Sequence, residues 1–132
     1  MAPGGTAPEP PSHGPPPLVL VVEDEFLIAT ELERLLGRHG WRVLGPAPTA
    51  GEALRLLDGG ARPDVALLDA TLRGGTAAPV AARLRALGVP FVLASAYDGA
   101  RLAALGLGGA PNLGKPADER RLLAALARAA GR

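Results

Sequence analysis

The sequence predicts an α/β fold in which a doubly wound five-stranded parallel sheet, in strand order 2-1-3-4-5, carries helices on both faces. From residue 18 onward, short apolar runs alternate with longer segments of helical period, which is typical of βα units. Right-handed crossovers then place helices on both sides of the sheet. The length agrees with this, because 132 residues, of which 48% are hydrophobic, suffice for the core of one domain.

Residues 1–17 form a predicted disordered tail, so the domain is expected to span residues 18–132. The tail contains seven Pro and three Gly and almost no large apolar side chain. Such a segment buries too little surface to offset the entropy lost on ordering.

Composition excludes several classes of protein. The absence of Cys excludes a disulfide scaffold and a thiolate metal site. A formal net charge of +1 provides no basic excess for nucleic acid or an anionic membrane. No apolar run approaches the length of a membrane span, and the first residues do not resemble a secretory signal. A cytoplasmic protein is therefore expected.

The first half of the domain starts with an unbroken Val and Leu run, as in a strand buried on both faces. The apolar face of the following helix consists of Ile28, Leu32, Leu35 and Leu36, at helical spacing. Thr49 and Glu52 form a capping box that opens a second helix. The expected elements are a strand at Leu18–Val22, a helix at Phe26–Arg38, a strand at residues 41–44 and a helix at residues 49–57.

The second half repeats this pattern with a weaker ending. The clear elements are a strand at Val65–Leu68, a helix at residues 76–87, a strand at residues 91–94 and a last helix at residues 118–130. Residues 101–107 form a short Leu/Ala helix at best, and residues 112–114 are a poor strand by propensity. The fifth unit therefore has the weakest strand signal of the predicted sheet.

Polar residues follow the predicted strands where each one ends. Acidic or hydroxyl residues follow the first, third and fourth strands, and a lysine, the only one beside 13 arginines, follows the fifth. The carboxyl ends of parallel strands lie on one edge of the sheet, where ligands bind. We therefore expect one cleft to contain Glu23, Asp24, Asp69, Ser95 and Lys115.

The carboxylates in this cleft predict a metal site. Carboxylates gathered this closely raise one another's pKa or recruit a cation. Oxygen ligands without nearby His or Cys suit a hard ion, and a few carboxylates with water match Mg²⁺ better than Ca²⁺. Glu23, Asp24 and Asp69 are the predicted Mg²⁺ ligands, with the backbone carbonyl of Thr71 as a further one.

The remaining groups predict transfer of a phosphoryl group. Asp69 stands alone at the end of an apolar strand and is the predicted acceptor, since a carboxylate forms an acyl phosphate when cations neutralise the transferring oxygens. Ser95 would donate its hydroxyl to a phosphoryl oxygen. Lys115 would pair with Asp69 or with the phosphate as a mobile point charge.

Over about residues 18–130 the chain resembles the receiver domain of bacterial two-component response regulators. The motifs that carry the resemblance are Glu23-Asp24, Leu67-Leu68-Asp69, Ala94-Ser95 and Lys115-Pro116. Each motif is weak alone, but the ordered set is specific. The resemblance implies a flavodoxin-like fold, Mg²⁺ at the acidic pair, and a phosphorelay in which a sensor histidine kinase phosphorylates Asp69.

The chain departs from the commonest receiver pattern at one position. Receivers commonly carry Tyr or Phe three residues before the lysine, a ring that swings inward on phosphorylation, whereas this chain has Asn112. Tyr97, two residues after Ser95, is the alternative switch candidate. Residues 93–97 are loosely similar to a receiver subgroup with a Phe-Ala-Thr-Gly-Tyr-type segment, which is often paired with kinases of the HWE or a related class.

The expected function is that of a stand-alone phosphoacceptor rather than an enzyme. The chain beyond Lys115 has room only for the last helix, so the signal would pass to a downstream protein partner or a phosphotransfer protein, not to nucleic acid. Because Asn112 stands where receivers commonly have an aromatic ring, a receiver-like interaction module that works without phosphorylation is the alternative function. A flavin carrier is disfavoured because Glu23 and Asp24 would repel the flavin phosphate. A haloacid-dehalogenase-type phosphatase would need a second Asp where Thr71 stands.

Overall fold

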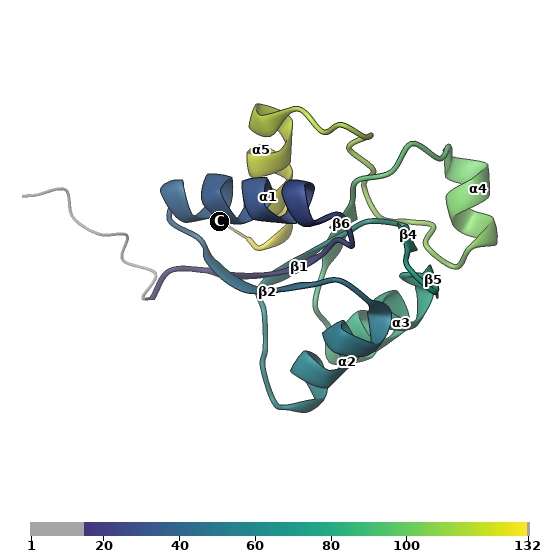
Figure 1. Cartoon of the computed structure of the whole chain (residues 1–132), viewed down its shortest axis with the longest axis horizontal. Helices are drawn as coiled ribbons and strands as arrows, with labels where there is room; N and C mark the ends of the chain where they lie inside the picture. The colour runs from purple at the N-terminus through teal and green to yellow at the C-terminus, as the bar shows by residue number, and fades with distance from the viewer. Residues whose placement is uncertain (1–14, 132) are drawn as a thin grey trace, which may run out of the picture.

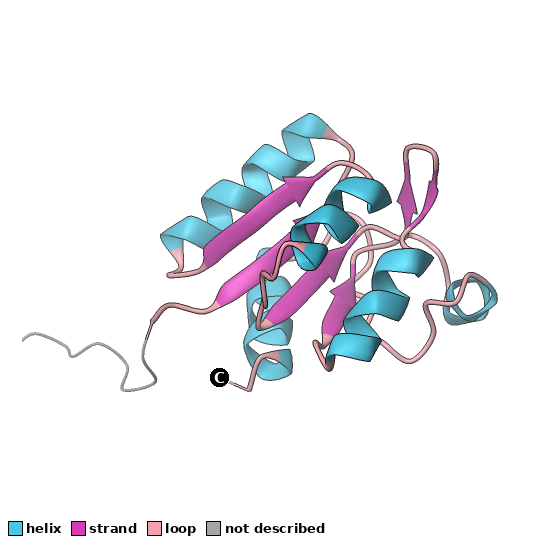
Figure 2. Ribbon diagram, turned by 90° about the horizontal axis from the view of Figure 1, so that it is seen from below, coloured by secondary structure: helices cyan, strands magenta, loops and turns pink. Residues whose placement is uncertain are grey.

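The computed structural model describes residues 15–131, so most of the predicted tail, residues 1–14, lies outside the described residues. The main sheet has four parallel strands: β1 (Leu18–Val22), β2 (Arg42–Ala47), β3 (Val65–Leu68) and β6 (Phe91–Leu93). Their order is β2-β1-β3-β6, and Figure 2 shows them as magenta arrows that point the same way. The predicted order of the first four strands is confirmed.

Helices cover both faces of this sheet. In Figure 1, α1 (Phe26–Arg38) and α5 (Glu119–Ala129) lie on one side of the strands, and α2 (Ala50–Asp58) and α3 (Ala78–Leu87) lie on the other. The short helix α4 (Gly99–Ala104) lies beyond β6 at the edge of the fold. The predicted doubly wound class is thus confirmed. Among residues 15–131, no helix is both long and apolar enough to cross a membrane.

The core is divided by the sheet into two layers, because successive side chains of a strand point to opposite faces. In β1, Val19 and Val21 pack in the layer under α1 and α5, which includes Leu36. Leu20 and Val22 pack in the opposite layer with residues of α2 and α3. Burial on both faces explains why the strand is an unbroken apolar run.

Two sequence predictions about the helices are confirmed in large part. On the predicted inner face of α1, Leu35 and Leu36 are buried and Ile28 and Leu32 are half-buried, whereas Phe26 and Leu27, which lie outside that predicted set, are 79% and 75% exposed. At the start of α2, the Thr49 hydroxyl oxygen accepts a hydrogen bond from the Glu52 N–H at 3.1 Å. This bond satisfies one of the free N–H groups of the first helical turn.

The predicted fifth strand at residues 112–114 does not form, and this corrects the expected number of strands. Only a single parallel bridge joins Asn112 to Leu93, on the edge where a fifth strand belongs. Pro111 has no N–H to donate, and an Asn side chain competes for nearby backbone groups. The segment therefore keeps its predicted position without extending into a strand.

Smaller differences concern the bounds of other elements. β2 continues to Ala47, past the Gly-Pro pair expected to close it, and its pairing with β1 shifts register between Leu20 and Val22. A two-stranded hairpin that sequence reasoning missed, β4 (Thr71–Leu72) with β5 (Gly75–Thr76), follows β3. Among the helices the largest differences are in α3, which starts at Ala78 rather than residue 76, and in α4, which spans Gly99–Ala104 rather than residues 101–107.

Candidate functional site

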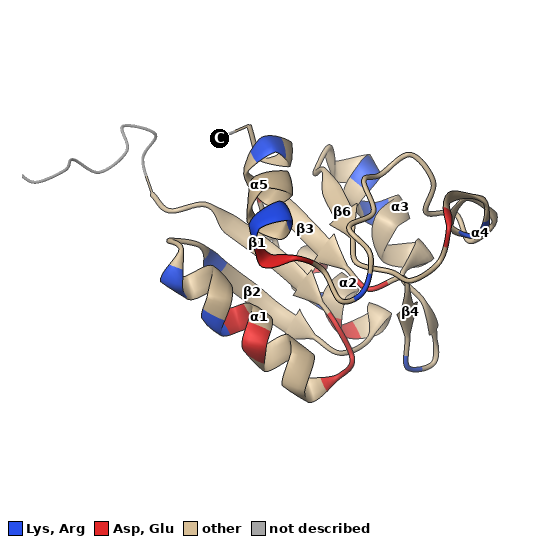
Figure 3. Ribbon diagram, turned by 90° about the horizontal axis from the view of Figure 1, so that it is seen from above, with Lys and Arg blue, Asp and Glu red and all other residues tan. Residues whose placement is uncertain are grey.

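Three carboxylates meet where two neighbouring strands end. Glu23 and Asp24 directly follow β1, and Asp69 directly follows β3, which pairs with β1 as far as Val22 and Leu68. One oxygen of each carboxylate lies within 4.8 Å of the others. Figure 3 shows the acidic stretch, in red, in the loop between β1 and α1. The fold thus brings together three acidic residues that the sequence analysis assigned to one cleft.

Backbone hydrogen bonds hold these strand ends in place. The Glu23 N–H donates to the Ala47 carbonyl at 3.0 Å, and the Asp69 N–H donates to the Val22 carbonyl at 3.0 Å. The Glu23 and Asp69 residues are only 4% and 7% exposed, whereas Asp24 is half-buried. Two of the three carboxylates are therefore largely removed from water.

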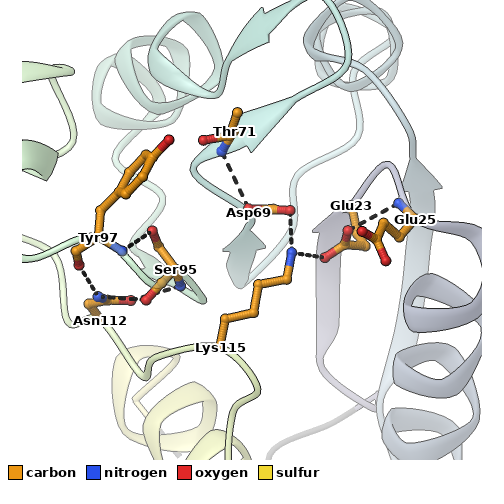
Figure 4. A network of polar contacts seen from close by, with 8 residues as sticks. All are labelled: Glu23, Glu25, Asp69, Thr71, Ser95, Tyr97, Asn112 and Lys115. Atoms are coloured by element: carbon orange, nitrogen blue, oxygen red, sulfur yellow. Dashed lines mark hydrogen bonds and ion pairs between the residues drawn. The ribbon is translucent and has the colours of Figure 1, made fainter.

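Lys115 faces this pair of buried carboxylates (Figure 4). Its Nζ lies 2.6 Å from Oδ2 of Asp69 and 3.5 Å from Oε1 of Glu23. Partial burial alone would lower the pKa of the Lys115 ammonium, but the hydrogen bond and charge of Asp69, together with Glu23, raise that pKa above its ordinary value. Lys115 is therefore a fixed positive charge beside Asp69.

The Glu23 carboxyl has a raised pKa even though Lys115 faces it. Burial raises its pKa, and the charge of Asp69 raises it further, whereas the Glu25 N–H hydrogen bond at 3.1 Å and the charge of Lys115 oppose the increase. The net direction is upward. A site whose own lysine does not fully compensate its carboxylates favours an additional cation.

The donor set fits a hard divalent cation such as Mg²⁺. The cluster offers carboxylate oxygens from Glu23, Asp24 and Asp69, and such ligands suit Mg²⁺, which keeps several of its waters. An open cavity of about 610 Å³, lined by Glu23 and Asp24 and bordered by Arg73, lies beside the cluster. It has room for a hydrated ion and for a group bound to it.

Thr71 lies at the start of the β4–β5 hairpin, two residues beyond Asp69. Its backbone N–H donates to Oδ1 of Asp69 at 3.3 Å. This bond orients the carboxylate from the side opposite the Lys115 contact, which engages Oδ2. The role of the Thr71 carbonyl as a metal ligand stays a prediction.

Ser95 and Tyr97 lie on the other side of Asp69 from Glu23 (Figure 4). Ser95 is 4% exposed, and its Oγ accepts a hydrogen bond from the Tyr97 N–H at 3.0 Å. Tyr97 is half-buried, and the Arg101 guanidinium lies 4.9 Å from its ring centroid. The roles of Ser95 as a phosphate ligand and of Tyr97 as a switch stay predictions.

Sequence reasoning missed the structural role of Asn112, which lies near the site. Its side chain makes four hydrogen bonds, to backbone groups of Ser95, Tyr97 and Gly114. The sequence drew attention to this position only because it lacks an aromatic ring. The signal available was the residue type, since Asn commonly bonds to nearby backbone.

A family model decides what kind of domain carries this site: the model described as the response regulator receiver domain matches residues 19–127. This chain belongs to the response regulator receiver family. Receiver domains are in general non-enzymatic signalling modules of two-component systems, with an acidic pocket for Mg²⁺ and a phosphorylated Asp.

Individual relatives of this receiver domain agree with the family match. It is 38% identical over 115 residues to the positive alginate biosynthesis regulatory protein of Pseudomonas aeruginosa, covering 84% of this chain and 46% of that protein. It is 36% identical over 81 residues to the phyllosphere-induced regulator PhyR of Methylorubrum extorquens, covering 60% of this chain and 30% of PhyR. The chain therefore spans less than half the length of either relative.

The fold is also that of solved receiver structures. The crystal structure of a response regulator receiver protein from Sinorhizobium medicae superposes with a TM-score of 0.78 at 22% sequence identity, covering 88% of this chain and 95% of that one. At this identity the likeness concerns the fold alone. It agrees with the flavodoxin-like architecture expected from the sequence.

Proposed function

We propose that this receiver domain accepts a phosphoryl group on Asp69 from a sensor histidine kinase. The observation that carries the proposal is the contact of 2.6 Å between Lys115 Nζ and Asp69 Oδ2, next to Glu23 and Asp24, whose carboxylate oxygens lie within 4.8 Å of that of Asp69. A buried carboxylate beside a fixed ammonium and a cation site is equipped to carry a phosphoryl group.

In the proposed reaction, a carboxylate oxygen of Asp69 attacks phosphorus and forms a new O–P bond. The P–N bond to the kinase histidine breaks, and the leaving imidazole nitrogen takes up a proton. Lys115 neutralises a phosphoryl oxygen, and the Ser95 hydroxyl donates to another. Glu23 and Asp24 would hold Mg²⁺ with Asp69, and the bound ion supplies positive charge for the transferring oxygens.

The signal would leave this domain through a protein. Phosphorylation replaces the single negative charge of the Asp69 carboxylate by an acyl phosphate group that carries about −1.5 to −2 at neutral pH. A shift from 1:99 to 99:1 between two conformations needs about 5.5 kcal/mol of differential stabilisation. New bonds from phosphorylated Asp69 to Ser95 and Lys115 would supply part of it. The proposed receiving partner is a downstream protein or a phosphotransfer protein. The proposed location of the domain is the cytoplasm.

The proposal extends to the class of the sensor kinase. The segment from Leu93 to Tyr97 is loosely similar to the receiver subgroup that is often paired with HWE-class kinases, which supports a kinase of that class. Tyr97, held at its N–H and carbonyl, is the switch candidate within this subgroup.

Labelling with radioactive acetyl phosphate tests the phosphoacceptor. With Mg²⁺ the wild-type chain should be labelled, and both Asp69→Asn and a chelator should abolish the label. Asp58→Asn is a matched control, because Asp58 is an exposed carboxylate that pairs with Arg83, and it should be labelled like the wild type. Equal labelling of the Asp69→Asn variant would refute the proposal.

One observation favours a second candidate, an interaction module that works without phosphorylation. The position of the usual mobile ring carries Asn112, whose side chain is held by four hydrogen bonds. In that case Asp69→Asn would leave partner binding unchanged, whereas changes at Arg101 and Leu105 would abolish it.

A further inference from the structure

The side chain of Asn112 uses its whole hydrogen-bonding capacity at the edge of the site. Oδ1 accepts from the Ser95 N–H at 3.0 Å and from the Gly114 N–H at 3.3 Å. Nδ2 donates to the carbonyls of Ser95 and Tyr97, both at 3.1 Å. An amide offers two donor hydrogens and two acceptor lone pairs, so every one has a partner. These four bonds are called the Asn112 network below.

The Asn112 network stands where a fifth strand would continue. The ladder on this edge runs from the Leu93 N–H to the Pro111 carbonyl and from the Leu113 N–H to the Leu93 carbonyl, both at 2.8 Å. In a regular parallel ladder the next bonds would join the N–H and carbonyl of Ser95 to the backbone of residues 113 and 115. Both groups of Ser95 instead bond to the Asn112 amide.

This replacement leaves the backbone after Leu113 free to leave the sheet. It turns at Gly114, whose φ of +81° lies in the left-handed region that favours glycine. The turn precedes Lys115, whose Nζ reaches Asp69. Asn112 thus holds Ser95 as a strand would, while the chain that carries the lysine turns toward the carboxylates.

The network also extends to the hydroxyl of Ser95. Asn112 holds the carbonyl of Tyr97, and the N–H of the same residue donates to Ser95 Oγ at 3.0 Å. With one lone pair of Oγ occupied in this way, its own hydrogen is free to act as a donor. Ser95 follows β6, the strand next to β3, so this donor lies beside the strand end that carries Asp69.

We propose that Asn112 is a positioning residue, which holds the Ser95 hydroxyl in place to bind a phosphoryl group on Asp69. This inference rests on the proposed function. Because the Asn112 network replaces strand pairing, Ser95 is held in place before phosphorylation. Asn112 itself does not touch the phosphoryl group and acts through Ser95.

A double-mutant cycle tests this role, with the rate of Mg²⁺-dependent labelling of Asp69 by acetyl phosphate as the measurement. Asn112→Leu removes the whole Asn112 network at similar volume and should slow labelling roughly tenfold, since a displacement of about 1 Å in a reacting group can cost up to about 100-fold. In the Ser95→Ala background the same substitution should cause no further loss. Mg²⁺ affinity should be unchanged in all four proteins, because the metal ligands follow other strands.

Asn112→Asp is the second variant for the same cycle. It keeps an oxygen for the two N–H donors but turns its other carboxylate oxygen toward the two carbonyls, which repel it, so its loss should be at least as large as that of Asn112→Leu and should again disappear with Ser95→Ala. An equal loss in both backgrounds, or no loss in either, would overturn the positioning role while Asp69 labelling stands. A wild-type chain that takes no label on Asp69 would overturn the proposed function and this inference together.

Discussion

Lys115 contacts both buried carboxylates of the site, and its charge competes with any cation that binds the same oxygens. At an effective dielectric constant of about 20, two unit charges about 4 Å apart interact by about 4 kcal/mol. The ammonium therefore both stabilises the metal-free site and weakens metal binding. A single substitution separates these two effects.

Lys115→Met should bind Mg²⁺ roughly tenfold more tightly, which corresponds to about 1.4 kcal/mol, because the competing ammonium is gone. Without metal, its free energy of unfolding should fall by roughly 1–3 kcal/mol, since Glu23 and Asp69 lose their charged partner. Calorimetric Mg²⁺ titration and urea unfolding measure the two effects.

The control for this substitution is Arg83→Met, which removes a cation from the exposed pair with Asp58. It should leave Mg²⁺ affinity unchanged. If Lys115→Met weakened Mg²⁺ binding, the ammonium would be supporting the metal site instead of competing with it.

At the scale of elements, helix α1 packs against the core with one face only. Leu36 is fully buried in the layer under α1 and α5, whereas Leu27, on the same helix, is 75% exposed beside the site. The two leucines have the same chemistry and differ only in their surroundings. They form a matched pair for measuring what burial contributes.

Leu36→Ala should lower the free energy of unfolding by about 2–5 kcal/mol, because a buried Leu-to-Ala change loses transfer energy and leaves a cavity. Leu27→Ala should change it by less than about 0.5 kcal/mol, as exposed substitutions do. Chemical denaturation of both variants provides the measurement. Equal losses would mean that α1 does not pack as described.

At the scale of the whole molecule, the site joins parts of the chain that are far apart in sequence. The carboxylates follow β1 and β3, and Lys115 precedes α5. A ligand that binds these groups binds only the folded chain, since no such cluster exists when the chain is unfolded. Occupancy of the site should therefore raise the stability of the entire domain.

Mg²⁺ at about 100 times its dissociation constant should stabilise the fold by about 2.7 kcal/mol, seen as a higher Tm. Asp24→Asn should remove most of this gain, because it deletes one of three carboxylate ligands. Glu52→Gln is the matched control, since Glu52 is an exposed carboxylate at the start of α2, and should show the wild-type gain. A gain that persists in Asp24→Asn would place the cation elsewhere.

Much of this structure follows from local patterns in the sequence. Apolar period predicts four of the strands and the inner face of α1, because each pattern needs only neighbouring residues. The predicted strand order rests instead on the topology of doubly wound sheets. Strand-end position further predicts that Glu23, Asp24 and Asp69 meet. The β4–β5 hairpin escaped prediction because two short pairs of residues around Gly74 carry no periodic signal.

By itself, the sequence determined the fold class, the family and the residues gathered at the carboxyl edge of the sheet, because periodicity and strand-end position are local properties. The tertiary structure alone decided that Lys115, which was predicted to pair with Asp69, contacts Glu23 as well, and that the Asn112 network stands in for a fifth strand. The reason is physical: these hydrogen bonds and ion pairs join atoms whose separation is set by packing between distant segments. A linear pattern contains no such distance.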